Sequence, residues 1–123
     1  MIAGAETGPR TPGAVEARVA RALLLTRPFV HLHPWEPHFL TLDEGALHYL
    51  DEGPAGAEPI LCLHGNPTWC FAWRALVEDL AGRYRVVAPD HLGCGLSDKP
   101  GGARYDLAAH VDRLDRLVQS LDL

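Results

Sequence analysis

Residues 61–74 read LCLHGNPTWCFAWR, an apolar run that passes through a short loop into a helical pattern. Ile60–Leu63 shows no alternation of polar and apolar residues, which is typical of a strand covered on both faces. The apolar residues that follow recur at intervals of three and four: Trp69, Trp73, Leu76, Val77 and Leu80. This spacing predicts a helix over residues 69–81, with Thr68 as its N-cap and Gly82 at its C-terminal end.

The residues before this stretch predict a hairpin. Phe39–Asp43 and Leu47–Asp51 are rich in Leu, aromatic and β-branched residues, and Asp43-Glu44-Gly45 supplies turn chemistry between them. A further buried strand is predicted over Tyr84–Ala88, beyond the first helix.

A second helix is predicted after a glycine-rich loop, with Asp106 as its N-cap. Its apolar stripe consists of Leu107, Val111, Leu114, Val118 and Leu121. Asp112 and Arg116 are spaced to pair on its outer face. The order hairpin, strand, helix, strand, helix predicts an α/β protein whose later strands are parallel.

The N-terminal 33 residues are set apart as an extension, and residues 34–123 as the α/β domain. We expect residues 1–13, with three glycines and two prolines, to be a disordered lead-in. Residues 14–26 favour a short helix that lies on its own domain, with docking on a partner as the alternative. The apolar side of this helix consists of Val15, Val19, Ala22 and Leu23.

Composition excludes several function classes. Eleven basic residues against sixteen acidic ones give a net charge of −5, and no basic cluster predicts a nucleic-acid partner. The three cysteines share no CxxC spacing, which indicates reduced thiols and a cytoplasmic location. The longest apolar run near the N-terminus, Ala22–Leu25, is too short to span a bilayer, so no membrane partner is expected.

Asn66 is the candidate functional residue, because ligands of open α/β sheets bind beyond the carboxyl ends of the strands. Gly65 lets the backbone turn, and backbone N–H groups before a helix are free to meet negative charge. The Asn66 amide adds uncharged donors suited to an oxyanion or a departing halide. The alternative is that Asn66-Pro67 only starts a turn.

Three segments carry a resemblance to a known family: LHGNPTW with a downstream WR, VVAPDHLGCGLSDKP, and PHFLTLDEGALHYLDEG. Together, over residues 34–123, they resemble the haloalkane dehalogenase branch of the α/β-hydrolase fold. Within that branch, HGNPTW and PDHLGCGLSDKP are similar to bacterial β-lactone decarboxylases of long-chain olefin synthesis.

The resemblance implies a cofactor-free hydrolase that acts on a small molecule through a carbon–halogen or lactone bond. It makes the Asn66 N–H part of an oxyanion hole and its side chain a ligand for the leaving anion, with Pro67 after a cis peptide bond. The nucleophile is then an Asp on an elbow after the fifth strand, and a later His activates water. An epoxide hydrolase and a serine esterase of the same fold are the alternatives.

Neither GxSxG nor Gly-His-Asp-Trp-Gly occurs in the 123 residues. We therefore expect the N-terminal part of an α/β-hydrolase sheet that ends before the fifth strand, a truncated domain that is inactive by itself. The resemblance places the third strand between the fourth and the fifth, so the Ile60–Leu63 edge would be unpaired and open to self-association.

Other candidate residues have structural interpretations. His64 is expected to pack within its loop, and Asp90, with Ser97 and Asp98, to hold the backbone of the second motif. GCGLSD at residues 93–98 lacks the third glycine of a dinucleotide fingerprint. The prolines among His31, His33, Glu36 and His38 disturb the spacing that a metal site needs, so no metal is expected.

Overall fold

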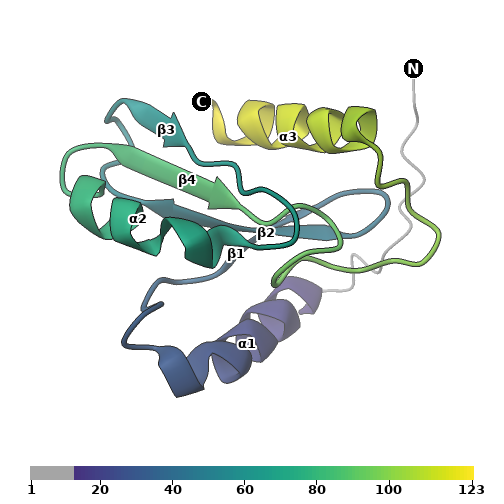
Figure 1. The fold of residues 1–123 in the computed structure, drawn as a ribbon, viewed down its shortest axis with the longest axis horizontal. Helices are drawn as coiled ribbons and strands as arrows, with labels where there is room; N and C mark the ends of the chain where they lie inside the picture. The colour runs from purple at the N-terminus through teal and green to yellow at the C-terminus, as the bar shows by residue number, and fades with distance from the viewer. Residues whose placement is uncertain (1–12) are drawn as a thin grey trace.

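The computed structural model describes residues 13–123 as a mixed sheet with helices around it (Figure 1). The strands are β1 (His38–Thr41), β2 (Ala46–Glu52), β3 (Pro59–Leu61) and β4 (Arg85–Pro89). The α-helices are α1 (Ala14–Thr26), α2 (Arg74–Leu80) and α3 (Leu107–Leu121), with 3-10 turns η1 (Arg27–Phe29) and η2 (Cys70–Trp73). The predicted lead-in falls on residues 1–12, outside the described residues, and on Gly13.

The strand order is β1-β2-β4-β3, with β3 at one edge of the sheet. β1 and β2 form the predicted hairpin, in which Thr41 faces Ala46 across the turn. β2 pairs antiparallel with β4, whereas β3 and β4 are parallel, with Ile60 opposite Val86. The α/β prediction with parallel later strands is therefore confirmed.

The prediction that the first helix of the domain starts at Trp69 is wrong. Trp69 is extended, with φ of −160°, and the chain then makes the 3-10 turn η2 before α2 begins at Arg74. Thr68 is not an N-cap, because the first N–H of the turn, on Cys70, donates to the Asp90 carboxylate at 2.7 Å. An acceptor from a distant loop replaces the local cap.

The main core lies between α2 and the sheet. Val77 of α2 is fully buried together with Leu50, Val86 and Ala88 from the strands, and Cys62 and Cys70 fill the space beside them. A second cluster joins Leu42, Leu47 and Leu92 near the hairpin turn.

α3 begins as predicted, since the Asp106 side chain accepts from the Ala109 N–H at 3.0 Å. The predicted apolar stripe does not form its buried face. Leu107 and Val111 are 79% and 56% exposed, whereas Arg113 and Leu117 are buried. Ion pairs attach α3 to the hairpin turn: Arg113 with Glu44 at 3.0 Å, and Arg116 with Asp43 at 3.7 Å in place of the predicted Asp112.

α1 packs on the body of the protein, and the strands lie between α1 and α3 in Figure 1. Arg18 pairs with Asp98 at 2.9 Å, and Ala22 and Thr26 are the buried residues of the helix. Val15 and Leu23 are more than 40% exposed, so the predicted apolar side only partly faces the core. None of the described helices is long and apolar enough to cross a membrane.

Candidate active site

Two loops meet where the parallel strands β3 and β4 end (Figure 1). The first carries HGNP and the second carries DHLGCG. The backbone N–H of His91 donates to Nε2 of His64 at 2.9 Å, and the ring Nε2 of His91 lies 3.1 Å from the His64 carbonyl oxygen. The loops are thus joined by two hydrogen bonds at the edge of the sheet where ligands of this fold class bind.

Asn66 lines a cavity of about 650 Å³. The walls come from the HGNP loop, from the DHLGC segment, and from α3 with its approach; among them are Leu63, His91, Cys94, Tyr105, His110 and Leu114. Asn66 is exposed, and its amide makes no hydrogen bond to any residue that the structure describes. Its donors are therefore free to meet a ligand.

Pro67 follows a cis peptide bond, as the resemblance implies. It is exposed beside Asn66 but does not line the cavity. Of the two residues expected to bind substrate, the structure therefore places only Asn66 on the cavity wall.

His64 is a packing residue, as expected. It is 5% exposed, and Nδ1 lies 2.6 Å from the Gly65 carbonyl oxygen. Burial lowers the pKa of His91; the neighbouring His64 ring adds to this shift, while the hydrogen bond to the His64 carbonyl opposes it. The lowered pKa favours the uncharged form of His91 beside the cavity.

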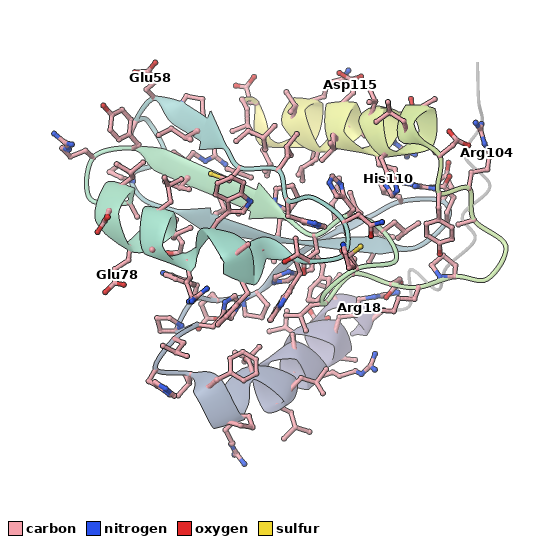
Figure 2. All side chains as sticks on the ribbon, in the orientation of Figure 1. Arg18, Glu58, Glu78, Arg104, His110 and Asp115 are labelled. Atoms are coloured by element: carbon pink, nitrogen blue, oxygen red, sulfur yellow. The ribbon has the colours of Figure 1, made fainter. Side chains whose placement is uncertain are left out.

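His91 and His110 are site residues that the sequence reasoning missed. Their rings are 5.1 Å apart, and burial lowers the pKa of His110 as well. Figure 2 shows His110 on the side of α3 toward the sheet and Asp115 on the outer side. Only the i to i+4 spacing with Leu114 hinted that His110 shares the cavity face.

Asp90 holds the backbone around the two loops through hydrogen bonds from its buried side chain. It is fully buried, and its carboxylate accepts from the N–H groups of Cys70 and Leu96, at 2.7 and 2.8 Å, and bonds Nδ1 of His48 at 2.8 Å. Burial disfavours the charge, but the bond with His48 and the N–H donors outweigh it and hold the pKa of Asp90 below its usual value. The Ser97 hydroxyl donates to the Asp90 carbonyl oxygen at 2.7 Å. A carboxylate so enclosed has a structural role, not that of a nucleophile.

Gly95 is required by this arrangement. Its φ of 52° is left-handed, and a Cβ there would lie 2.3 Å from Oδ2 of Asp90 and 2.8 Å from the Cβ of Trp69. GCGLSD is therefore a tight loop around the carboxylate, as expected.

His48, Cys70 and Asp90 are the one group among the described residues whose ligand atoms are close enough for a metal, all within 4.8 Å. The Asp90 oxygens already accept from N–H groups, and burial together with the charge of Asp90 raises the pKa of the Cys70 thiol. A protonated thiol and an occupied carboxylate do not suit a metal ion.

The N-terminal histidines serve packing. His33 is 3% exposed and lies between the rings of Trp35 and Trp69, with centroids 5.4 Å from each, while His38 stacks on Tyr49. Burial lowers the pKa of His33. Together with Glu36 and His31, they form no metal-binding group in the described part of the chain.

A model of the alpha/beta hydrolase fold family matches residues 58–123, which contain both loops. The chain belongs to the α/β-hydrolase fold family. Its relatives within this family include decarboxylases and haloalkane dehalogenases.

Three relatives show the range of activities among proteins similar to this chain. A cis-3-alkyl-4-alkyloxetan-2-one decarboxylase of Xanthomonas campestris pv. campestris is 53% identical over 85 residues, 63% of this chain and 28% of that protein. The tetrameric haloalkane dehalogenase DpaA of Paraglaciecola agarilytica NO2 has a TM-score of 0.68 at 36% identity, over 73% of this chain and 32% of that one. An epoxide hydrolase from metagenomes of hot environments has a TM-score of 0.67 at 30% identity, over 72% of this chain and 30% of that one. The chain thus spans less than a third of each relative.

Proposed function

We propose that this α/β hydrolase cleaves a carbon–halogen or lactone bond, with Asn66 binding the negative charge that develops on the leaving group or the carbonyl oxygen. The residues described here supply the opening part of the catalytic domain. An Asp nucleophile, its acid partner and the catalytic His lie beyond these 123 residues in the proposed enzyme.

The proposal rests on one observation: the side-chain amide of Asn66 lies on the cavity wall, beyond the carboxyl end of β3, without a hydrogen-bond partner among the described residues. A neutral donor stabilises developing charge when it is aimed at the place where that charge arises. The same amide bonded into its own loop would indicate only a turn. The structure has it exposed instead.

Among the candidate reactions, we favour the opening and decarboxylation of a β-lactone that carries alkyl chains. The support is the 53% identity to the Xanthomonas oxetanone decarboxylase over a region that includes HGNPTW. The leucines of the cavity wall, Leu63, Leu107 and Leu114, suit alkyl groups. Loss of CO2 from such a ring leaves an alkene, so the product distinguishes this reaction from halide release or diol formation.

The test supplies the full-length protein with a cis-dialkyl β-lactone, a haloalkane and an epoxide in parallel. We expect alkene from the lactone, and we expect Asn66→Ala to lower kcat by about 10²–10³-fold, the usual loss for one oxyanion-hole donor. Gln119→Ala is the matched control, because Gln119 also carries an exposed amide, but on α3, where it bonds Asp115 at 2.8 Å. An Asn66→Ala enzyme with unchanged kcat would contradict the proposal.

A second candidate is self-association without catalysis. β3 is an edge strand, and the apolar residues Leu107 and Val111 of α3 are exposed beside the same cavity. An open apolar edge invites pairing with another chain. Sedimentation of the 123-residue chain tests this candidate: we expect concentration-dependent association that Leu63→Lys reduces, whereas a sharp monomer with a cooperative thermal transition would argue against it.

A further inference from the structure

The two histidines that join the loops bond each other reciprocally. The His64 ring accepts from the His91 backbone, and the His91 ring reaches the His64 carbonyl oxygen. The ring centroids are 4.3 Å apart, and His64 is buried. Each histidine therefore holds the main chain of the other.

These bonds fix where the protons lie. A backbone N–H can only donate, so Nε2 of His64 carries a lone pair and, in the neutral ring, the proton is on Nδ1. Nδ1 then donates to the Gly65 carbonyl oxygen at 2.6 Å. Since the His64 carbonyl oxygen can only accept, Nε2 of His91 carries the proton of that ring.

The proton on Nδ1 of His64 sets the direction of the next peptide group. The Gly65–Asn66 bond is trans, because Asn66–Pro67 is the one cis peptide bond among the described residues. In a trans peptide group the N–H points opposite to the C=O. With the Gly65 carbonyl turned to the His64 ring, the Asn66 N–H points away from that ring, and it has no acceptor in the described part of the chain.

The space beside the Gly65 Cα is open. Nothing lies within 4 Å of the position that a Cβ on Gly65 would take. A glycine with open space around it rotates at little cost. Among the described residues, the hydrogen bond from His64 is the side-chain contact on the Gly65 carbonyl, and through the peptide plane it also sets the direction of the Asn66 N–H.

We propose that His64 and His91 act as a positioning pair that aims the Asn66 N–H at the reacting oxygen or leaving group. His91 acts through His64: its ring holds the His64 carbonyl and its N–H selects the His64 tautomer. The inference rests on the proposed function for its catalytic consequence, but the tautomer and the peptide orientation can be measured without turnover.

The first measurement is NMR on the full-length protein labelled with 15N-histidine. We expect His64 in the Nδ1–H form and His91 in the Nε2–H form. His64 in the Nε2–H form would overturn the inference whatever the reaction, and this measurement needs no variant.

The second measurement compares two substitutions at His91. His91→Phe keeps a planar ring but removes the donor to the His64 carbonyl, whereas the amide nitrogen of Gln in His91→Gln takes the place of Nε2. We expect His91→Phe to shift the backbone N–H resonance of Asn66 and to lower kcat about tenfold with KM unchanged. This is a fraction of the loss expected when a whole donor is removed. His91→Gln should restore both. His64→Asn, whose amide nitrogen replaces Nδ1, should keep the Asn66 resonance near its original position.

The outcomes separate this inference from the proposed function. If His91→Phe moves neither the Asn66 resonance nor kcat, the positioning pair is refuted, even where Asn66→Ala abolishes turnover. If Asn66→Ala leaves kcat unchanged while His91→Phe shifts the backbone N–H resonance of Asn66 and His91→Gln restores it, the pair stands and the proposed anion-binding role of the Asn66 side chain fails.

Discussion

Asp90→Asn tests the network on which both loops depend. The substitution keeps the shape of the side chain but replaces a carboxylate oxygen by an NH2 group. In the native protein one oxygen accepts from the Cys70 N–H, and the other accepts from the Leu96 N–H and bonds the His48 ring. Whichever way the new amide turns, one backbone N–H faces a donor.

The magnitude follows from counting these bonds. A buried N–H without an acceptor costs about 1–3 kcal/mol, and a bond that changes from a charged to a neutral acceptor loses about 1 kcal/mol. One orphaned N–H, one weakened bond and a disturbed His48 contact give a loss of about 2–5 kcal/mol in the free energy of unfolding. Such a loss is large against the total of about 5–15 kcal/mol that stabilises a domain.

The assay is urea unfolding of the full-length protein at pH 7, with hydrogen exchange of the Cys70 and Leu96 amides as a local readout. Asp115→Asn is the control, because Asp115 is exposed on α3 and should change stability by no more than about 0.5 kcal/mol. If Asp90→Asn is as mild as this control, or if the two amides keep their protection, the structural role of Asp90 is refuted.

Two further predictions concern stability. Gly95→Ala should destabilise the protein by more than about 2 kcal/mol, since the new Cβ would lie 2.3 Å from the Asp90 carboxylate; Gly101→Ala, with open space around it, should be near neutral in the same unfolding assay. The thermal midpoint should also fall as pH is lowered from 7 toward 5. Burial lowers the pKa of His33, His91 and His110 in the folded state, so the unfolded chain binds more protons below about 6.5 and is favoured there. A midpoint that rises over this range would contradict that assignment.

The fold was largely predictable because its signals are local. Apolar runs marked β3 and β4, turn residues marked the hairpin, and Asp106 marked the start of α3. The cap of η2 was not predictable, because the acceptor for Cys70 lies twenty residues further along the chain. A rule that searches for a neighbouring Thr cannot find it.

The buried face of α3 was misjudged for another physical reason. Periodicity counts apolar residues, and the predicted stripe therefore left out Arg113. The Arg113 side chain is 2% exposed because Glu44 receives its guanidinium group. The first three residues of the predicted stripe, Leu107, Val111 and Leu114, line the cavity instead. The ion pairs of Arg113 and Arg116 join α3 to acidic residues of the hairpin turn. The sequence of the helix alone does not show where that turn lies.

Asn66 was predicted as a candidate from its place after a strand, and the structure places it on the cavity wall. The contacts that hold its loop were not predicted, because they come from two consecutive residues of another loop. Side chains of adjacent residues in an extended chain point to opposite sides. At the end of β4 this alternation sends Asp90 to the Cys70 N–H and His91 to the His64 carbonyl. The segment from residue 64 to residue 70, with Asn66 inside it, is therefore held at both ends by one dipeptide. Because both contacts hold the same short segment, the effects of Asp90→Asn and His91→Phe on kcat should not add, and additive effects would show that the two ends act independently.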